Sequence, residues 1–99
     1  MKLIGRNKIT TFINEKSDSK RALNDWVTII QEANWKNSVE MKLVYKKADL
    51  VGNCTVFDIR GNNYRLITAI SYKLQIIEVL YILTRSEYDR NKWKKDCDC

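Results

Sequence analysis

The chain has 99 residues, of which 44% are hydrophobic and 30% are charged, so it is long enough to bury one core and too apolar for a disordered segment. It carries 18 Lys and Arg against 12 Asp and Glu, a net charge of +6, and no histidine, which excludes Ser-His-Asp and Cys-His catalysis and zinc sites built on histidine. The basic surplus favours a polyanion or an acidic protein as partner; the alternative is a basic surface that only aids solubility.

The length predicts a single domain over residues 1–99, and two absences in the sequence predict a soluble, cytoplasmic protein. Residues 1–6 lack the apolar run of a signal peptide, and no stretch approaches the roughly 18–20 apolar residues of a membrane span, so no membrane association is expected. Lys2-Leu3-Ile4 is a candidate edge strand.

Two amphipathic helices are predicted next. Apolar residues at helical spacing predict a first helix over about residues 7–16 and a second that follows the caps offered by Ser17-Asp18-Ser19. The stripe of the second helix consists of Leu23, Trp26, Ile30 and Ala33, widened by Ala22 and Ile29. Asn37 and Glu40 have the spacing of a capping box, which predicts a short helix through Met41, Val44 and Tyr45.

From Leu50 the pattern changes to strands. Strands are predicted from Leu50 to Ile59, from Tyr64 to Tyr72 and from Leu74 to Leu83, with Lys73 at the corner of the second hairpin. Asn and Gly in residues 60–63 suit a tight turn, and the third strand is apolar on both faces, as expected of a central strand.

A terminal helix is predicted after the strands. Thr84 and Glu87 form a second capping box, and Tyr88 and Trp93 are placed to dock this helix on the sheet. The order of elements predicts an α+β fold in which the N-terminal helices pack on one face of a small antiparallel sheet. The other face is then open and available as a ligand platform.

The sequence predicts one role for Cys54 and another for the two cysteines near the end of the chain. Cys54 lies in a strand pattern and is expected to be a small core residue. Cys97 and Cys99 form a C-x-C pair that lacks further metal ligands, so we expect residues 95–99 to be a flexible tail with reduced thiols and no metal site.

After these exclusions, the chemistry that the residues still permit is reaction at a phosphate without a metal or cofactor. The chain has no Gly-rich phosphate loop, and its acidic residues are scattered, without metal-binding spacing. RNA can be cut by its own 2′-OH, provided that the protein stabilises charge on the phosphate and moves two protons. Arginines suit the first task, and Tyr88, Glu87, Asp58 or a lysine with a lowered pKa could transfer a proton.

Arg65 is a candidate for holding the phosphate. It alternates with Ile67 and Ala69 along its strand, so these three side chains share one face of the sheet. If that face is the open one, Arg65 points at the substrate. The alternative is that Arg65 only pairs across strands with Asp58 or Glu78.

Several motifs recur in order along the second half of the chain. They are Ala48-Asp49-x-Val51-Gly52-Asn53, Val56-Phe57, Gly61-Asn62-x-Tyr64-Arg65-Leu66-Ile67, Ile70, Tyr72, Gln75 and Thr84-x-x-Glu87-Tyr88-Asp89, with looser matches at Trp26 and Trp35-Lys36. With these motifs the chain resembles the HigB family of bacterial toxins, within the wider RelE/ParE toxin superfamily. The resemblance implies a RelE-like fold, namely helices on one face of an antiparallel sheet and a terminal helix.

The resemblance also implies the toxin of a type II toxin–antitoxin pair, an mRNA endoribonuclease (mRNA interferase) that inhibits translation, often on the ribosome. Its implied partners are mRNA, the ribosome and a HigA-like antitoxin with a helix-turn-helix domain, which should be acidic where it meets the toxin. Arg65 matches the arginine of the family's YRL segment, and Arg85 and Tyr88 fall near the Arg and Tyr of RelE-like enzymes. Family members usually carry His where this chain has Arg85, and often Asn where it has Asp58.

We therefore expect a metal-independent nuclease in which Arg60, Arg65 and Arg85 hold the scissile phosphate and Tyr88 stacks on a base or moves a proton. Residues expected to contact RNA are Lys42, Lys46, Lys47, Asn63 and Lys73; Asp58 and Glu87 are candidates for proton transfer. Two alternatives share the fold: a ParE-like toxin that binds and poisons DNA gyrase, and a decayed toxin that only binds its antitoxin.

Overall fold

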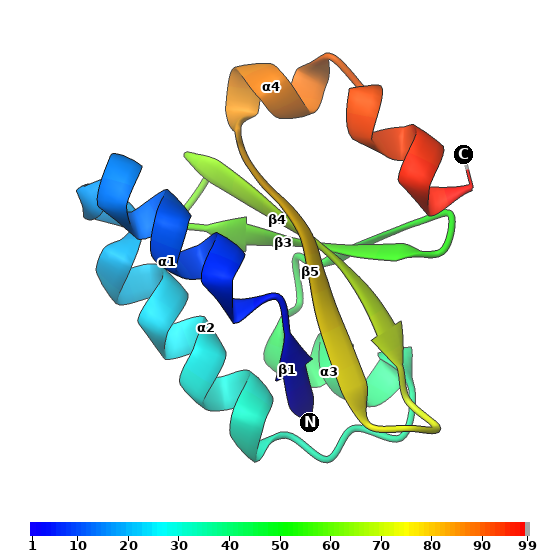
Figure 1. Ribbon diagram of the computed structural model, residues 1–99. Helices are drawn as coiled ribbons and strands as arrows, with labels where there is room; N and C mark the ends of the chain where they lie inside the picture. Colours follow the sequence, from blue (N-terminus) through cyan, green and yellow to red (C-terminus); the bar gives the residue numbers. More distant parts are fainter. Residues whose placement is uncertain (99) are drawn as a thin grey trace.

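The computed structural model describes residues 1–98 and shows a five-stranded sheet with strand order β1-β5-β4-β3-β2 (Figure 1). The strands are β1 (Lys2–Ile4), β2 (Asp49–Val51), β3 (Cys54–Ile59), β4 (Tyr64–Ser71) and β5 (Ile76–Thr84). Neighbouring strands run antiparallel except for β1, which pairs parallel with the start of β5. The predicted α+β class is confirmed, and β5 is an interior strand as expected.

One face of the sheet is covered by the N-terminal helices, as predicted. These are α1 (Arg6–Glu15), the 3-10 turn η1 (Ser17–Ser19), α2 (Lys20–Glu32) and α3 (Ser38–Val44). Trp26 of α2 is buried and packs edge-on against Phe57 of β3, with ring centroids 5.5 Å apart. The predicted cap of α3 is present, because the Asn37 side chain accepts from the backbone N–H of Glu40 at 3.0 Å.

The prediction of one continuous strand from Leu50 to Ile59 is wrong. Gly52 and Asn53 form a turn that divides this stretch into β2 and β3, which fold back on each other. Gly52 has a φ of 56°, a left-handed conformation that glycine adopts without steric strain. The third strand begins at Ile76 because Leu74 lies in the turn before it and is 66% exposed.

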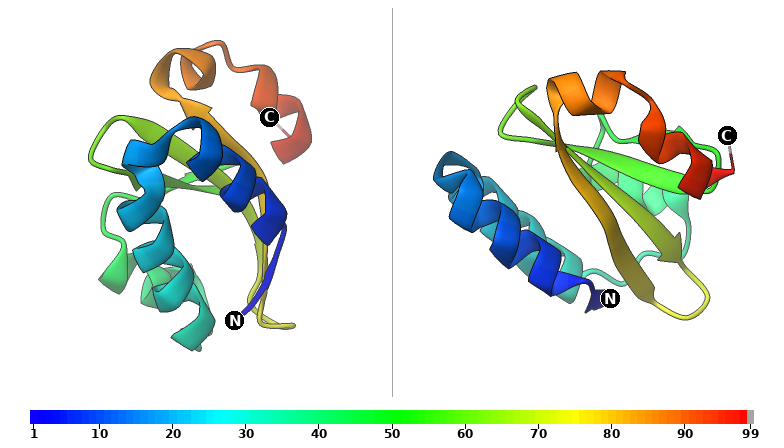
Figure 2. Two further views of the ribbon diagram at one scale, coloured as in Figure 1. Left: turned by 60° about the vertical axis from the view of Figure 1, so that its left-hand side comes forward. Right: turned by 45° about the horizontal axis from the view of Figure 1, so that its top comes forward.

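The opposite face of the sheet is covered too, which corrects the expectation of an open platform. The chain turns after β5 into α4 (Arg85–Asp89) and the 3-10 helix η2 (Lys92–Cys97), which lie across this face on the side away from α1 and α2 (Figure 2). The capping box of Thr84 and Glu87 starts α4 as predicted. Trp93 is 2% exposed and packs with Val56 and Ile67, so the predicted docking of Trp93 on the sheet is confirmed.

A disulfide joins Cys54 of β3 to Cys97 of η2, so the expectation of reduced thiols in a frayed tail is wrong for Cys97. Residues 95–97 belong to η2, and Cys97 is fully buried. The two cysteines are 43 residues apart, and their pairing depends on how η2 crosses the sheet. Cys99 lies outside the described residues. Within residues 1–98 no helix is long and apolar enough to cross a membrane.

Candidate functional site

The candidate site is organised by Arg65, which faces Asp58 across the β3–β4 hairpin. The Arg65 Nε lies 3.2 Å from the Asp58 Oδ1, and the two side chains are only 13% and 26% exposed. Arg65 also donates from Nη1 to the carbonyl oxygens of Asn62 and Tyr64, at 3.1 and 3.2 Å. Of the two predicted cross-strand partners, the structure therefore pairs Arg65 with Asp58.

Tyr88 of α4 lies against Arg65, with the guanidinium carbon 5.5 Å from the ring centroid, within the range of a cation–π contact. Tyr88 also stacks on Trp93, whose ring lies 4.8 Å away at an interplanar angle of 14°. The Trp93 Nε1 also donates to the Tyr88 carbonyl oxygen at 2.9 Å. Burial raises the pKa of Tyr88, and the nearby carboxylate of Asp49 raises it further, so the phenol keeps its proton at neutral pH.

A cleft of about 370 Å³ opens beside this cluster. Asp58 and Asn62 line it from the β3–β4 hairpin, and Lys46 and Lys47 line it from the turn after α3. Both lysines are exposed, so their ammonium groups can reach an anion that enters the cleft. The predicted basic run therefore lies next to the predicted arginine.

Arg60 does not join Arg65. Its Nη1 lies 3.0 Å from the Oδ2 of Asp18 in η1, and the Tyr64 hydroxyl donates to the other oxygen of the same carboxylate at 2.6 Å. Tyr64 in turn packs edge-on against Phe12 of α1, at 5.1 Å between centroids. Arg60 thus fastens the hairpin to the helical face, while Arg65 projects on the other face.

Glu87 is held in the cap of α4, and Arg85 lies beside it in the first turn of this helix. The Glu87 Oε1 accepts from the backbone N–H and the hydroxyl of Thr84, at 2.9 and 3.0 Å. These hydrogen bonds lower the pKa of Glu87, which makes its carboxylate a weak base and assigns it to helix capping. Arg85 is exposed in the first turn of α4, and no hydrogen bond or ion pair of its side chain is found within residues 1–98.

The other predicted RNA contacts are spread over the surface. Lys42 is exposed on α3, and Asn63 is exposed in the β3–β4 turn near the cleft. Lys73 lies in the β4–β5 turn, at the opposite end of the sheet from the β3–β4 turn (Figure 1). The structure therefore places Lys46 and Lys47 in one cleft with Asp58, the partner of Arg65, and leaves Lys73 apart.

Two residues of the site, Asp49 and Asn62, were not predicted from the sequence. Asp49 pairs with Val56 and so faces the same side of the sheet as Asp58, near Tyr88. Asn62 lines the cleft and accepts from Arg65. Asp49 could not be placed in the site because the sequence of β2 and β3 resembles that of one strand. Asn62 could have been predicted, since it is a turn residue close to Arg65 in the sequence. Residues 1–98 contain no group of three or more potential metal ligands among His, Cys, Asp and Glu.

Comparison with families of known proteins relates this chain to one of them. Residues 19–91 match the family model described as HigB_toxin, the RelE-like toxic component of a toxin–antitoxin system. The matched range includes the hairpin, the cleft, Arg65 and Tyr88, and the five-stranded sheet with its helices is compatible with a RelE-like fold. A search of curated proteins found no match.

Proposed function

Since this chain belongs to the HigB family of RelE-like toxins, the toxic components of toxin–antitoxin systems, we propose that it is an endoribonuclease that cuts mRNA. The observation that carries the proposal is the convergence of Arg65, Asp58 and Tyr88 beside the cleft lined by Lys46 and Lys47. A toxin that acts only by binding a protein such as gyrase does not need a cation, a carboxylate and a protonated phenol at one point.

The proposed reaction is attack of the RNA 2′-oxygen on the adjacent phosphorus. The O2′–P bond forms and the P–O5′ bond breaks, which leaves a 2′,3′-cyclic phosphate and a free 5′-hydroxyl. Asp58 takes the proton of the 2′-OH, and Tyr88, which its environment keeps protonated, gives a proton to the leaving 5′-oxygen. No metal or cofactor is needed for this step, because each proton has a donor or an acceptor in the protein.

Arg65 has the role of stabilising the charge on the phosphoryl oxygens. Its Nε and Nη1 are occupied by Asp58 and by backbone carbonyls, while no acceptor for Nη2 is found within residues 1–98. These contacts fix the guanidinium before the substrate arrives, and a fixed cation stabilises developing charge better than a mobile one. Lys46 and Lys47 hold the neighbouring phosphates of the strand.

The family implies an antitoxin as partner. We propose that it is a HigA-like helix-turn-helix protein with an acidic contact surface, because the chain carries a net charge of +6. The same charge favours the ribosome as the place where mRNA is met, so that the toxin acts in the cytoplasm and inhibits translation.

The test is to induce the chain in cells and to map new 5′ ends across the mRNAs, beside an Arg65→Ala variant and an Arg21→Ala control, since Arg21 is exposed on α2 on the other face of the sheet. The proposal predicts new 5′-hydroxyl ends that disappear with Arg65→Ala and persist with Arg21→Ala; ends that follow the reading frame would support cleavage on the ribosome. Growth arrest without new ends would reject the nuclease and direct the search to gyrase supercoiling. No arrest at all would favour a toxin that has lost its activity.

A further inference from the structure

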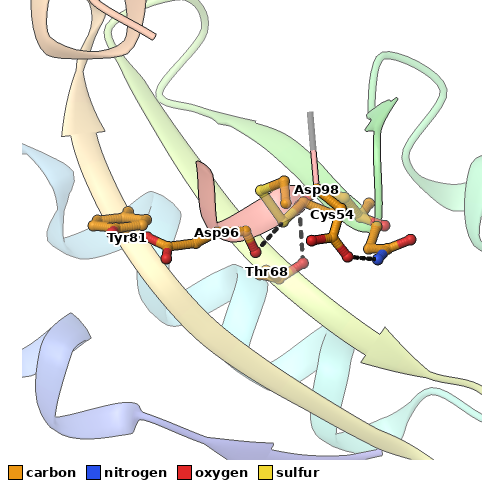
Figure 3. Close-up of a disulfide and its surroundings, with 8 residues drawn as sticks. Cys54, Thr68, Tyr81, Asp96 and Asp98 are labelled. Atoms are coloured by element: carbon orange, nitrogen blue, oxygen red, sulfur yellow. Dashed lines mark hydrogen bonds between the residues drawn. A yellow bond between two sulfur atoms is a disulfide. The ribbon is translucent and has the colours of Figure 1, made fainter. Parts of the chain in front are cut away.

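The segment that carries Tyr88 and Trp93 is held to the sheet at its far end by the disulfide between Cys54 and Cys97 (Figure 3). The Asn53 N–H donates to the Cys97 carbonyl oxygen at 2.8 Å, beside the turn between β2 and β3. The Tyr81 hydroxyl of β5 is hydrogen-bonded to the carboxylate of Asp96. The disulfide and two hydrogen bonds thus attach the end of this segment to the sheet.

The sequence of η2 gives this segment little stability of its own. Of its six residues, Trp93 and Cys97 are buried, and the others are Lys or Asp side chains. A 3-10 helix has poorer hydrogen-bond geometry than an α-helix and is rarely stable without tertiary support. The attachment at Cys97 therefore contributes a large part of what keeps η2 on the sheet.

The position of η2 matters because Trp93 supports Tyr88. The indole stacks on the phenol and donates to its backbone carbonyl, and the phenol lies against the guanidinium of Arg65. A continuous chain of contacts thus runs from the disulfide through Trp93 and Tyr88 to Arg65.

We propose that Cys54 and Cys97 form a redox-sensitive site whose disulfide holds the Tyr88–Trp93 segment in place and whose reduction releases it. A dithiol reductant attacks one sulfur and forms a mixed disulfide, and its second thiol then displaces the protein thiol. The S–S bond takes up two electrons and two protons to give two thiols, while the reductant becomes a disulfide. Once released, η2 no longer supports Tyr88, and the cleft loses affinity for RNA; only this last step rests on the proposed function.

The burial of the sulfurs determines how this site responds. Cys54 is 2% exposed and Cys97 is fully buried, so a thiolate reaches them only when η2 has lifted from the sheet. Reduction should therefore be slow in the folded protein and faster wherever η2 opens. RNA bound against Tyr88 should slow reduction further, since it favours the closed position of the segment.

The experiment uses trypsin, because Arg90, Lys92, Lys94 and Lys95 lie within the segment. The starting protein is the Cys99→Ser variant, which leaves Cys54 and Cys97 as the only possible pair. It is oxidised or reduced with dithiothreitol, and early peptides are identified by mass spectrometry. We expect cleavage in residues 90–95 to be at least tenfold faster after reduction, with little change at Lys and Arg of α1 and α2. Equal rates in the two states would overturn the proposal.

Two further measurements test the role of the disulfide in holding the segment separately from the proposed nuclease activity. The Cys54→Ser, Cys99→Ser double variant should be cleaved at the fast rate with or without reductant; if it does not fold, the reduced Cys99→Ser protein provides the same comparison. Binding of a single-stranded RNA oligonucleotide should be several-fold weaker in the reduced protein. Faster tryptic cleavage after reduction with unchanged RNA affinity would overturn the link between the disulfide and Tyr88. Faster tryptic cleavage after reduction without RNA binding in either state would support the role of the disulfide in holding the segment and would contradict the proposed function.

Discussion

Asp58 and Arg65 occupy directly opposite positions in the register of β3 and β4, and their side chains meet at 3.2 Å on the face that η2 covers. Because Arg65 is only 13% exposed, its charge is placed by this ion pair and by two backbone carbonyls. The same contacts that stabilise the hairpin therefore hold the guanidinium beside Asp58, which lines the cleft.

The first prediction concerns Arg65→Ala. Removing a fixed cation from a site of developing charge should lower the cleavage rate by about 100- to 1,000-fold. The lost charge-assisted hydrogen bonds should lower the free energy of unfolding by roughly 1–3 kcal/mol, which a folded domain tolerates. Cleavage of an RNA oligonucleotide and urea unfolding measure the two effects. Arg21→Ala is the matched control, since Arg21 is exposed on α2, on the other face of the sheet, and should affect neither; full activity of the Arg65 variant would remove Arg65 from the site.

Asp58→Asn separates binding from chemistry. Asparagine keeps a hydrogen-bond acceptor for Arg65 and removes the negative charge, so RNA should bind several-fold more tightly. Loss of the proton acceptor should lower the cleavage rate by about 10²- to 10⁴-fold. The dissociation constant and the single-turnover rate are measured on the same RNA. If the rate rises together with affinity, Asp58 only repels the substrate and the base lies elsewhere.

Tyr88→Phe tests the proton donor while keeping the ring. The stack on Trp93 and the contact with Arg65 do not need the hydroxyl, so the fold and RNA affinity should be unchanged. The cleavage rate should fall by about 10²- to 10⁴-fold. Because the raised pKa keeps Tyr88 protonated, the wild-type rate should not fall through loss of this proton until the pH exceeds 10. If the Phe variant cleaves RNA at the wild-type rate, the Tyr88 hydroxyl is not the proton donor and the ring only packs against Arg65 and Trp93.

Lys46→Ala and Lys47→Ala test the cleft through the salt dependence of binding. Each phosphate contact should contribute about 0.7 to the slope of log K against log salt for a single strand, so each variant should flatten the slope by that amount. Lys73→Ala removes the same charge at the far end of the sheet and should leave the slope nearly unchanged. A slope that depends equally on all three lysines would mean that only net charge matters.

The helices and the β3–β4 and β4–β5 hairpins could be predicted because their signals are local. The capping box of Thr84 and Glu87 and the cap of Asn37 are fixed by residues three positions apart, and the Trp26 stripe repeats with the period of a helix. The β3–β4 turn follows in the same way from its glycine and asparagines. These features need no knowledge of how distant segments meet.

The covered face could not be predicted because it depends on contacts between distant segments. Lys92–Cys97 has no apolar periodicity, and its burial comes from Trp93 and from Cys97, whose partner lies 43 residues away. The division at Gly52 was hidden for a related reason, since β2 and β3 are both strands and only the turn between them reverses the chain. For the site, Arg65 could be named from its strand and its motif, whereas the place of Asp49 near Tyr88 follows from the register of β2 on β3.

The last prediction concerns stability at high pH and depends on Tyr45. Burial, and secondly the charge of Asp25, raise the pKa of Tyr45 from 10.0 to about 12 in the folded protein. Between pH 10 and 12 the unfolded chain loses this proton and the folded chain keeps it, so ionisation favours unfolding. The contribution to stability is therefore complete below pH 10 and falls as the pH rises, by at most about 1.4 kcal/mol per pH unit for one group.

Tyr45→Phe isolates this contribution, because its ring can keep the edge-on contacts with Phe57 and Trp35, at 5.0 and 6.2 Å between centroids. The free energy of unfolding of both proteins is measured in urea at pH 8, 10 and 11. The wild type should lose more stability than the variant on going from pH 8 to 11, although both decline because other tyrosines also have raised pKa values. A difference between the two proteins that stays constant with pH would mean that the Tyr45 hydroxyl ionises as easily in the folded chain as in the unfolded one.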